Sequence, residues 1–252
     1  MEAERRLRAE YEKKRSNMIH LKIGEIPFSV REAVNTLRGN IQLSGYNLKS
    51  VAVTSSIAHE GKSSIAFQLA KSLAGLSKKC IYVDCDIRRS VFKLRYQVQG
   101  KPLGLSEYLC GKASLKEVVF HTEDNCLDIL FTGAAAPNPS ELLSGTLFSA
   151  LLENLKQNYD YVVVDTPPIN LVIDGAIVAK QCDGAVLVIE SGTTERAQAL
   201  RAKRQLEYAG VKLLGVVLNK VESKKSGYEY KYEQNEEKIQ RSKKRRALKQ
   251  ET

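Results

Sequence analysis

Six short apolar runs constrain the fold of this 252-residue chain more than any other feature of its sequence. They are rich in β-branched residues, and their nearly continuous apolar character is typical of strands buried on both faces. The runs lie at residues 51–54, 80–84, 127–130, 161–165, 185–189 and 214–218. Segments with helical character lie at 29–43, 63–76, 140–157 and 194–209. The alternation predicts an α/β fold in which a mostly parallel sheet has helices on both faces.

Charged residues are concentrated at the two ends of the chain, whose net charge is +10. Residues 1–20 hold six basic and four acidic residues, and residues 220–252 hold eleven and six. We predict a charged N-terminal arm at 1–25, a single domain at 26–221 and a flexible, disordered tail at 222–252. A basic tail suits an acidic partner, a membrane surface or nucleic acid, and the alternative is a solvated segment that binds nothing.

The cysteines indicate the compartment in which the chain works. Cys80, Cys85, Cys110, Cys126 and Cys182 are scattered and form no C-x-x-C pair. Such spacing argues against a disulfide framework or a zinc site and favours a reduced, intracellular setting. There is no run of eighteen apolar residues, and the N-terminus has no apolar signal-peptide region. We therefore expect a cytoplasmic protein.

The loop after the first apolar run has the context of a phosphate-binding P-loop. The strand at 51–54 leads into SSIAHEGKSS at 55–64 and then into a helix, so that backbone N–H groups point at phosphate oxygens. Lys62 would contact the β- and γ-phosphates, the Ser63 hydroxyl would ligate Mg²⁺, and Ser64 would reach the α-phosphate. The sequence therefore predicts an α/β fold of the P-loop NTPase type, with ATP and Mg²⁺ as cofactors.

This loop departs from the usual P-loop pattern, because Ser56 replaces its first glycine. The predicted nucleotide contacts come from Ser56, Ala58, His59, Glu60, Gly61, Lys62, Ser63 and Ser64. His59 is expected only to tolerate the loop conformation. The alternative is a Gly-Lys-Ser sequence in an ordinary loop, so the prediction depends on the acidic residues that follow other strands.

Two of the apolar runs end in aspartate, at Asp84 and Asp165. Because the carboxyl ends of parallel strands meet at one edge of a sheet, we expect both carboxylates near Lys62, where they could hold Mg²⁺ directly or through water. A single aspartate of this kind could be an ordinary strand terminator, but two beside a P-loop favour a metal site. Asn219 follows the last run and is predicted to contact adenine, with an ordinary strand-end asparagine as the alternative.

Four longer motifs carry a family resemblance. IYVDCDIRRS at 81–90 and YVVVDTPPI at 161–169 resemble a second Walker motif and a Walker B motif, while TGAAAPNPSELL at 132–143 and REAVNTLRGNIQLS at 31–44 resemble a typical loop and N-terminal helix. Over roughly residues 26–232 the chain resembles the cytoplasmic domain of the bacterial tyrosine kinases (BY-kinases), which serve capsule and exopolysaccharide synthesis and export. The form is that of the separate catalytic chains of Gram-positive bacteria.

The resemblance implies Mg²⁺- and ATP-dependent phosphorylation of tyrosines, first in the kinase's own tail. The residues it assigns to catalysis are Lys62, Asp84, Asp86 and Asp165, and those it assigns to the metal are Ser63, Asp84 and Asp165. Asp86 would be the base, and Arg88 or Arg89 would stabilise developing charge. A phenol with a pKa of about 10 is a poor nucleophile unless a carboxylate accepts its proton. The alternative for Asp86 is a helix cap or a salt bridge with one of the two arginines.

Three tyrosines in the tail, Tyr228, Tyr230 and Tyr232, are the predicted autophosphorylation sites. Their alternation would suit a core strand, but the charged flanks cannot form a core. Each phosphate would add about −1.5 to −2 charge, enough to reverse the basic charge of the tail when all three are modified. Isolated surface tyrosines need no such explanation, but a cluster in a charged tail does.

The resemblance also implies partners. A transmembrane activator of the chain-length-regulator type would recruit the kinase to the inner face of the membrane, and a cognate tyrosine phosphatase would reverse its modification. The dephosphorylated kinase would assemble into a homo-oligomeric ring through a Glu-x-x-Arg-x-x-Arg motif, which here reads Glu32, Asn35 and Arg38. The central arginine is therefore missing, and the basic segment at 243–249 has no assigned role. No nucleic acid is expected.

Two rival functions use the same fold. A positioning or partition ATPase would bind membrane or DNA through the basic tail, but those families carry an additional lysine where this chain has Ile57. A non-catalytic, nucleotide-dependent scaffold is the second rival, because Ala58 and His59 replace the Pro-Gly that is usual in the kinases. ATP binding without phosphate transfer would identify that case.

Overall fold

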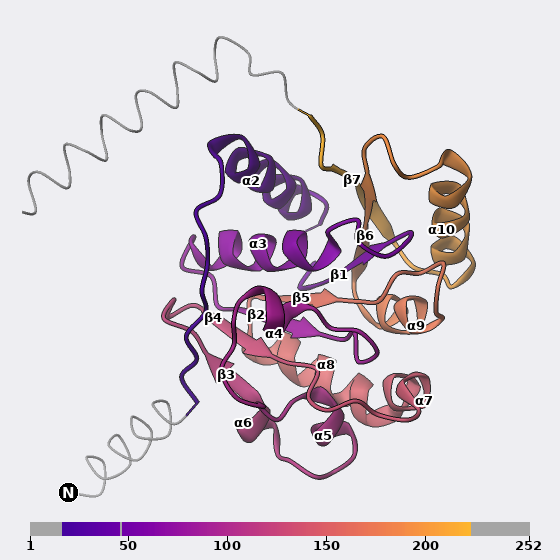
Figure 1. The fold of residues 1–252 in the computed structure, drawn as a ribbon. Coiled ribbons are helices and arrows are strands. Elements are labelled where there is room, and N and C mark those ends of the chain that lie inside the picture. Colours follow the sequence, from indigo (N-terminus) through magenta and orange to yellow (C-terminus); the bar gives the residue numbers. More distant parts are fainter. Residues whose placement is uncertain (1–16, 46, 223–252) are drawn as a thin grey trace, which may run out of the picture.

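The computed structural model describes residues 17–45 and 47–222, and its centre is a seven-stranded sheet (Figure 1). The strands are β1 (Ser50–Ser55), β2 (Cys80–Asp84), β3 (Val119–His121), β4 (Leu127–Leu130), β5 (Tyr161–Asp165), β6 (Gly184–Glu190) and β7 (Leu213–Asn219). Their order across the sheet is β3-β4-β2-β5-β1-β6-β7, and every pairing except the antiparallel β3–β4 is parallel. The six predicted strands are confirmed. Strand β3 was not predicted, because its three half-buried residues give too short a pattern.

The helices lie between the strands, as the alternation predicted. They are α2 (Phe28–Leu43), α3 (Lys62–Ala74), α4 (Phe92–Arg95), α5 (Leu105–Leu109), α6 (Leu115–Val118), α7 (Pro139–Ser144), α8 (Thr146–Asn158), α9 (Asp174–Gln181) and α10 (Arg196–Tyr208). The single helix expected at 140–157 is two helices, because Gly145 between them has an extended backbone. The short helices α4, α5 and α6 and the eight-residue α9 were not predicted.

Side chains of successive strand residues enter different cores on the two faces of the sheet. Val51 and Val53 of β1 pack in one core with residues of α2 and α3, whereas Ala52 packs in another with residues of α9 and α10. Figure 1 shows α2 and α3 above the sheet and α8 and α9 below it. The prediction of a mostly parallel sheet with helices on both faces is confirmed, and this packing fixes the carboxyl ends of β1, β2 and β5 side by side.

The segment before α2, residues 17–27, is a strap that lies against the domain (Figure 1). Met18 forms a parallel bridge with His121, where Ile19 N donates to His121 O at 2.9 Å, and Lys22 N donates to Tyr96 O at 3.0 Å. Residues 17–25 were expected to belong to a charged arm, whereas in the structure residues 17–19 join the sheet edge at β3 and Lys22 bonds the backbone at the end of α4.

Several predictions from the sequence fall outside the described residues. These are the arm at 1–16, the disordered tail from 223 onward, its basic segment at 243–249, and Tyr228, Tyr230 and Tyr232. Within 17–45 and 47–222, no helix combines the length and the hydropathy of a membrane span.

Helix α8 allows a matched test of its core contact. Leu151 is fully buried against the sheet, while Leu147 of the same helix is 41% exposed. We expect Leu151→Ala to lower the free energy of unfolding by about 2–5 kcal/mol, because it leaves a cavity in a packed core. Leu147→Ala has the same helix propensity change and should cost less than about 1 kcal/mol. Urea unfolding followed by circular dichroism measures both, and equal losses would contradict the assigned packing.

Candidate active site

The loop between β1 and α3 has the geometry of a nucleotide-binding P-loop. Gly61 adopts a left-handed φ of 94°, and a Cβ at this position would lie 2.2 Å from the side-chain nitrogen of Asn219, so only glycine fits. Helix α3 begins at Lys62 and directs its free N–H groups toward the loop. A cavity of about 1170 Å³ lies in front of it. Besides loop residues, its lining comprises Asp86, Ile87, Arg88, Arg89, Val91, Arg95, Ala135, Ala136, Pro139, Pro167, Pro168, Leu171, Val172, Asn219 and Lys220.

Two polar residues of the loop stabilise its shape from behind. The buried Glu60 carboxylate accepts hydrogen bonds from the Ser56 hydroxyl at 2.7 Å, from Ile57 N at 2.8 Å and from the Thr194 hydroxyl. Neither Ser56 nor Glu60 lines the cavity, and the side chains of both are engaged in this network. Only the backbone of these two predicted contacts could therefore reach a nucleotide. The serine that replaces the usual first glycine is thus part of a buried hydrogen-bond network.

The remaining loop residues face the cavity. Its lining includes Ala58, His59, Gly61, Lys62, Ser63 and Ser64, all predicted as nucleotide contacts. His59 has a φ of 69°, which agrees with the expectation that it tolerates an unusual backbone conformation. Asn219 also lines the cavity, and its amide donates to Glu60 O at 2.8 Å. The asparagine at the end of β7 therefore joins the last strand to the loop.

Lys62 is the centre of a buried cluster of charges. Its Nζ lies 2.9 Å from Asp86 Oδ2, 3.4 Å from Asp165 Oδ1 and 3.2 Å from the Ser63 hydroxyl. Burial alone would lower the pKa of Lys62, but the carboxylates of Asp165 and Asp86 outweigh it and raise the pKa above its ordinary value. The ammonium group is therefore charged at neutral pH, as phosphate binding requires.

Asp84 and Asp165 face each other across β2 and β5, where they are paired in register and each is 1% exposed. Burial, with a further contribution from the Asp165 carboxylate, raises the pKa of Asp84 to about 8. Burial also raises the pKa of Asp165, although Lys62 opposes this. Two buried carboxylates this close repel each other, and a bound cation removes the repulsion.

The cluster fits a divalent cation. Three carboxylates surround one ammonium group, which leaves a formal charge of −2 when all four groups are ionised. No group of three or more His, Cys, Asp or Glu side chains able to hold a metal by themselves occurs in the described part of the chain. Mg²⁺ does not need one, because it keeps several waters and uses one or two carboxylates together with substrate phosphates. Ser63, Asp84 and Asp165 suit that mode.

Comparisons with known proteins decide the family. A family model described as "AAA domain" matches residues 48–199. Over 197 residues the chain is 41% identical to "Tyrosine-protein kinase CpsD" of Streptococcus agalactiae, covering 78% of this chain and 86% of that relative. It is 39% identical over 202 residues to "Tyrosine-protein kinase YwqD" of Bacillus subtilis, covering 79% and 85%. The chain belongs to the bacterial tyrosine-protein kinases of the AAA domain family.

A solved structure agrees with this assignment. The crystal structure of the chimerical protein CapA2B2 superposes with a TM-score of 0.72 at 33% identity, covering 75% of this chain and 84% of that one. The resemblance predicted from the motifs, to the Gram-positive kinases of capsule and exopolysaccharide synthesis, is confirmed. The chain is thus an ATP-using tyrosine-protein kinase with a P-loop fold, and the rival ATPase and scaffold interpretations are not supported.

The two arginines after Asp86 differ in their contacts within the kinase. Arg88 Nε lies 2.6 Å from Asp174 Oδ2, and the guanidinium also donates to the Ser140 hydroxyl at 3.1 Å. Arg89 has an exposed side chain without a hydrogen bond or ion pair to the described residues, although it lines the same cavity. Arg88 therefore fastens its loop to α7 and α9, and Arg89 is the one available to a ligand.

Of the alternatives to a catalytic base that the sequence left open for Asp86, the structure shows a capping contact. One oxygen pairs with Lys62, and the other accepts a hydrogen bond from Arg89 N at 3.1 Å, which is a turn-capping contact. Its salt bridge is with the lysine rather than with either arginine. Asp86 lines the kinase's cavity while Asp84 and Asp165 lie deeper, so it is the carboxylate that an incoming acceptor group can reach.

Sequence reasoning missed two residues that contact the carboxylates. The Ser90 hydroxyl donates to Asp84 Oδ2, and the Tyr82 hydroxyl donates to Asp165 Oδ2 at 2.9 Å. Burial, together with the nearby Asp165 carboxylate, raises the pKa of Tyr82 well above its usual value, so this hydroxyl keeps its proton. The available signal was a tyrosine in an otherwise aliphatic strand, on the same face as Asp84 two residues later.

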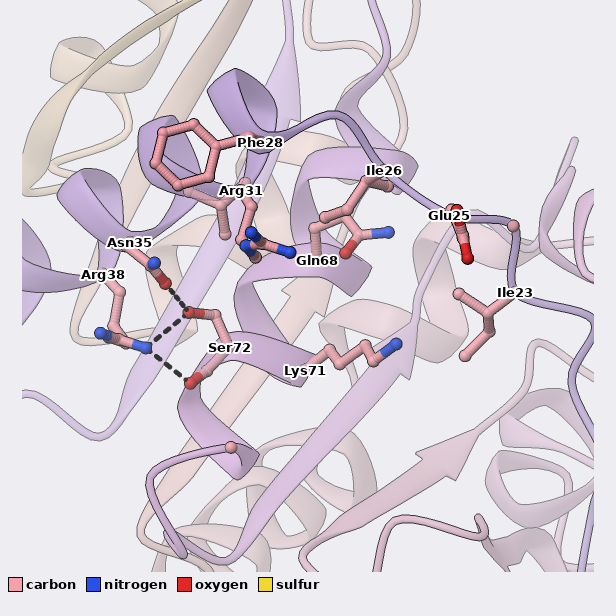
Figure 2. Close-up of a pocket in the computed structure, with 13 residues that line it drawn as sticks. Ile23, Glu25, Ile26, Phe28, Arg31, Asn35, Arg38, Gln68, Lys71 and Ser72 are labelled. Atoms are coloured by element: carbon pink, nitrogen blue, oxygen red, sulfur yellow. Dashed lines mark hydrogen bonds between the residues drawn. The ribbon is translucent and has the colours of Figure 1, made fainter. Parts of the chain in front are cut away.

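The predicted self-association pair lies away from this site, beside a second cavity of about 750 Å³ between the strap, α2 and α3 (Figure 2). Arg38 donates to Ser72 O at 2.9 Å and to the Ser72 hydroxyl at 2.8 Å. Asn35, where the family motif has arginine, bonds both Ser72 and Glu32. Within one chain of the kinase, Glu32 and Arg38 are thus linked through Asn35 and Ser72.

The arginine contacts lead to a stability prediction. Arg88→Ala should lower the free energy of unfolding by about 1–3 kcal/mol at neutral pH, because it removes hydrogen bonds to the buried Asp174 carboxylate. Arg89→Ala is the matched control and should change stability by less than about 0.5 kcal/mol. Urea unfolding measures the difference, and equal values for the two variants would contradict the assignment.

The contact between Arg88 and Asp174 should also make the stability depend on pH. Burial tends to raise the pKa of Asp174, but the hydrogen bonds from Arg88 and Ser140 outweigh it and hold the pKa below its ordinary value. The stabilisation is therefore present above the unfolded pKa of about 4 and is lost as the pH falls through the lower folded value. The gap between wild type and Arg88→Ala should shrink in that acidic range, and a gap that grows there would contradict this explanation.

Proposed function

We propose that this kinase is an autokinase that transfers the γ-phosphate of MgATP to tyrosines of its own tail, in the control of capsular or exopolysaccharide synthesis and export. The observation that carries the proposal is the cluster of Lys62, Asp84, Asp86 and Asp165 at the foot of the cavity. It combines a phosphate-binding cation, a carboxylate pair suited to a divalent metal, and one further carboxylate that faces the opening.

Nucleotide binding would use groups that already point into the cavity. The N–H groups of the loop and of the first turn of α3 would hold the phosphates, with Lys62 against the β- and γ-phosphates. Mg²⁺ held by Ser63, Asp84 and Asp165 would neutralise charge on the phosphates. Asn219, which lines the cavity beside Gly61, would contact the adenine end.

The transfer step assigns a separate role to Asp86. In the nucleotide-free structure its carboxylate pairs with Lys62. When the phosphates engage Lys62, Asp86 is released to accept the phenolic proton as the tyrosine oxygen attacks the γ-phosphorus and the bond to the ADP oxygen breaks. Arg89, whose side chain faces the same cavity, would stabilise charge on the transferred group, while Arg88 stays with Asp174.

The acceptor tyrosines would be Tyr228, Tyr230 and Tyr232, which lie outside the described residues. The chain leaves β7 at Asn219, and both Asn219 and Lys220 line the cavity, so the tail starts at the mouth of the nucleotide site. A tail that begins there supports phosphorylation within the chain or between neighbouring copies. Each added phosphate would reverse part of its basic charge.

The proposed partners follow from the family. We infer a transmembrane activator of the chain-length-regulator type, which would bring a cytoplasmic kinase to the inner face of the membrane, and a cognate tyrosine phosphatase. The chimerical protein CapA2B2 supports a partner of the first kind, because it joins two components in one chain. A ring of dephosphorylated copies would use the surface of α2 that carries Glu32 and Arg38. None of these roles involves nucleic acid.

Mass spectrometry after incubation with ATP and Mg²⁺ tests the proposal. Phosphotyrosine should appear at Tyr228, Tyr230 and Tyr232, and Lys62→Met should abolish it because the phosphates lose their buried cation. Lys203→Met is the control, since Lys203 lies half-exposed on α10 and pairs with Glu207. Phosphate confined to serine or threonine, or tyrosine phosphorylation that survives Lys62→Met, would refute the assignment.

A further inference from the structure

Tyr82 is a buried polar residue that the mechanism above leaves unused. It lies in the middle of β2 and is fully inaccessible to solvent. Its register partner on β5 is Val163, two residues before Asp165, so Tyr82 and Asp165 share one face of adjacent strands. The phenol therefore reaches diagonally along the sheet, and its hydroxyl donates to Asp165 Oδ2 at 2.9 Å.

We propose that Tyr82 is a positioning residue of the kinase reaction, because its hydroxyl holds one oxygen of Asp165 and so turns the other toward Lys62 and Ser63. Asp165 Oδ1 lies 3.4 Å from Lys62 Nζ, and the neighbouring Ser63 hydroxyl opposes the rise in the pKa of this carboxylate. With Oδ2 occupied by the phenol, the carboxylate presents one defined oxygen to the loop. Hydrogen bonds that orient a metal-binding carboxylate in this way determine how well the metal is held.

The tyrosine ring is itself fixed in place. Phe92 stacks on it with ring centroids 4.6 Å apart, and Phe67 contacts it edge-on at 5.9 Å. Phe92 in turn packs on Tyr96, whose carbonyl accepts a hydrogen bond from Lys22 of the strap at 3.0 Å. Because the ring is held by these contacts, the hydroxyl cannot move with the Asp165 carboxylate if the carboxylate rotates. The hydrogen bond from Tyr82 therefore fixes the orientation of the carboxylate.

A competing explanation is that the hydroxyl only needs a partner because it is buried. The chain offers a matched control for this possibility. Tyr159 is also buried, and its hydroxyl donates to Asp128 Oδ2 at 2.6 Å near the amino ends of β4 and β5. Asp128 pairs with His121 and lies outside the nucleotide cavity. Removing either hydroxyl breaks one buried Tyr–Asp hydrogen bond, but only Tyr82 contacts the site.

The test compares Tyr82→Phe with Tyr159→Phe in the full chain. ADP binding is measured by calorimetry without Mg²⁺ and across a Mg²⁺ titration, and steady-state kinetics give kcat and KM for ATP. For Tyr82→Phe we expect the Mg²⁺ concentration that gives half of the maximal Mg²⁺-dependent change in ADP affinity to rise about 10–100-fold. We also expect kcat to fall with little change in the KM for ATP. Its affinity for ADP without Mg²⁺ should stay within about twofold of wild type, because the hydroxyl touches no predicted nucleotide contact. Tyr159→Phe should match wild type in all of these.

Urea unfolding shows that both variants fold and reports the loss of each hydrogen bond. The inference is wrong if Tyr82→Phe keeps the wild-type Mg²⁺ dependence and kcat, or if Tyr159→Phe changes them as much. It rests on the proposed role of Asp165, which Asp165→Asn tests separately. If Asp165→Asn loses Mg²⁺-dependent binding while Tyr82→Phe behaves like wild type, only the proposed role of Tyr82 is wrong. If Asp165→Asn itself behaves like wild type, the proposed roles of both Asp165 and Tyr82 are wrong.

Discussion

The ammonium group of Lys62 lies among three buried carboxylates, and the rest of the site is arranged around this concentration of charge. Taking ions out of water costs several kcal/mol each unless partners and hydrogen bonds compensate. One ammonium group cannot compensate three buried carboxyl groups by itself, and the surroundings supply further donors: Ser90 for Asp84, Arg89 N for Asp86 and Tyr82 for Asp165. The raised pKa of Asp84 shows that this compensation is incomplete without a ligand.

Clusters of buried ionisable groups with shifted pKa values are common at functional sites. A cluster whose charges were fully compensated would gain little by binding a metal and phosphates, whereas the proposed divalent cation would reduce the repulsion between Asp84 and Asp165. The parallel pairing of β2 with β5, and of β5 with β1, brings the Asp84 and Asp165 carboxylates and the loop to one edge. The topology of the sheet is therefore what concentrates the charge, and the side chains around it limit the cost.

Much of the fold and of the site could be predicted from the sequence. Asp84 and Asp165 follow apolar runs, and parallel strands bring such positions together without knowledge of any side-chain contact. Lys62 was located because a strand–loop–helix context is local. The division of the predicted helix at 140–157 could also be suspected, since Gly145 lies inside it. These features depend on short-range pattern or on general rules of topology.

Other features depend on contacts between distant residues. The difference between Arg88 and Arg89 is set by Asp174, which lies in a helix that the sequence pattern did not predict. The inward orientation of Ser56 and Glu60 depends on Thr194, and the bond from Tyr82 depends on the register of β2 with β5. Residues 17–25 were assigned to the charged arm because the charged run before them dominates the N-terminus, although Ile19, Leu21 and Ile23 pack against the core at alternate positions.

The position of Asn219 at the end of β7 and beside the phosphate loop has a practical consequence for truncated versions of this kinase. The residue ends β7, and its side-chain amide donates a hydrogen bond to the carbonyl of Glu60 in the phosphate loop. A deletion meant to remove only the tyrosines must therefore stop after this asparagine. A shorter version would lose a support of the phosphate loop together with the proposed acceptor tyrosines, and an enzyme inactivated by the damaged loop could then be mistaken for one that lacks only its acceptor.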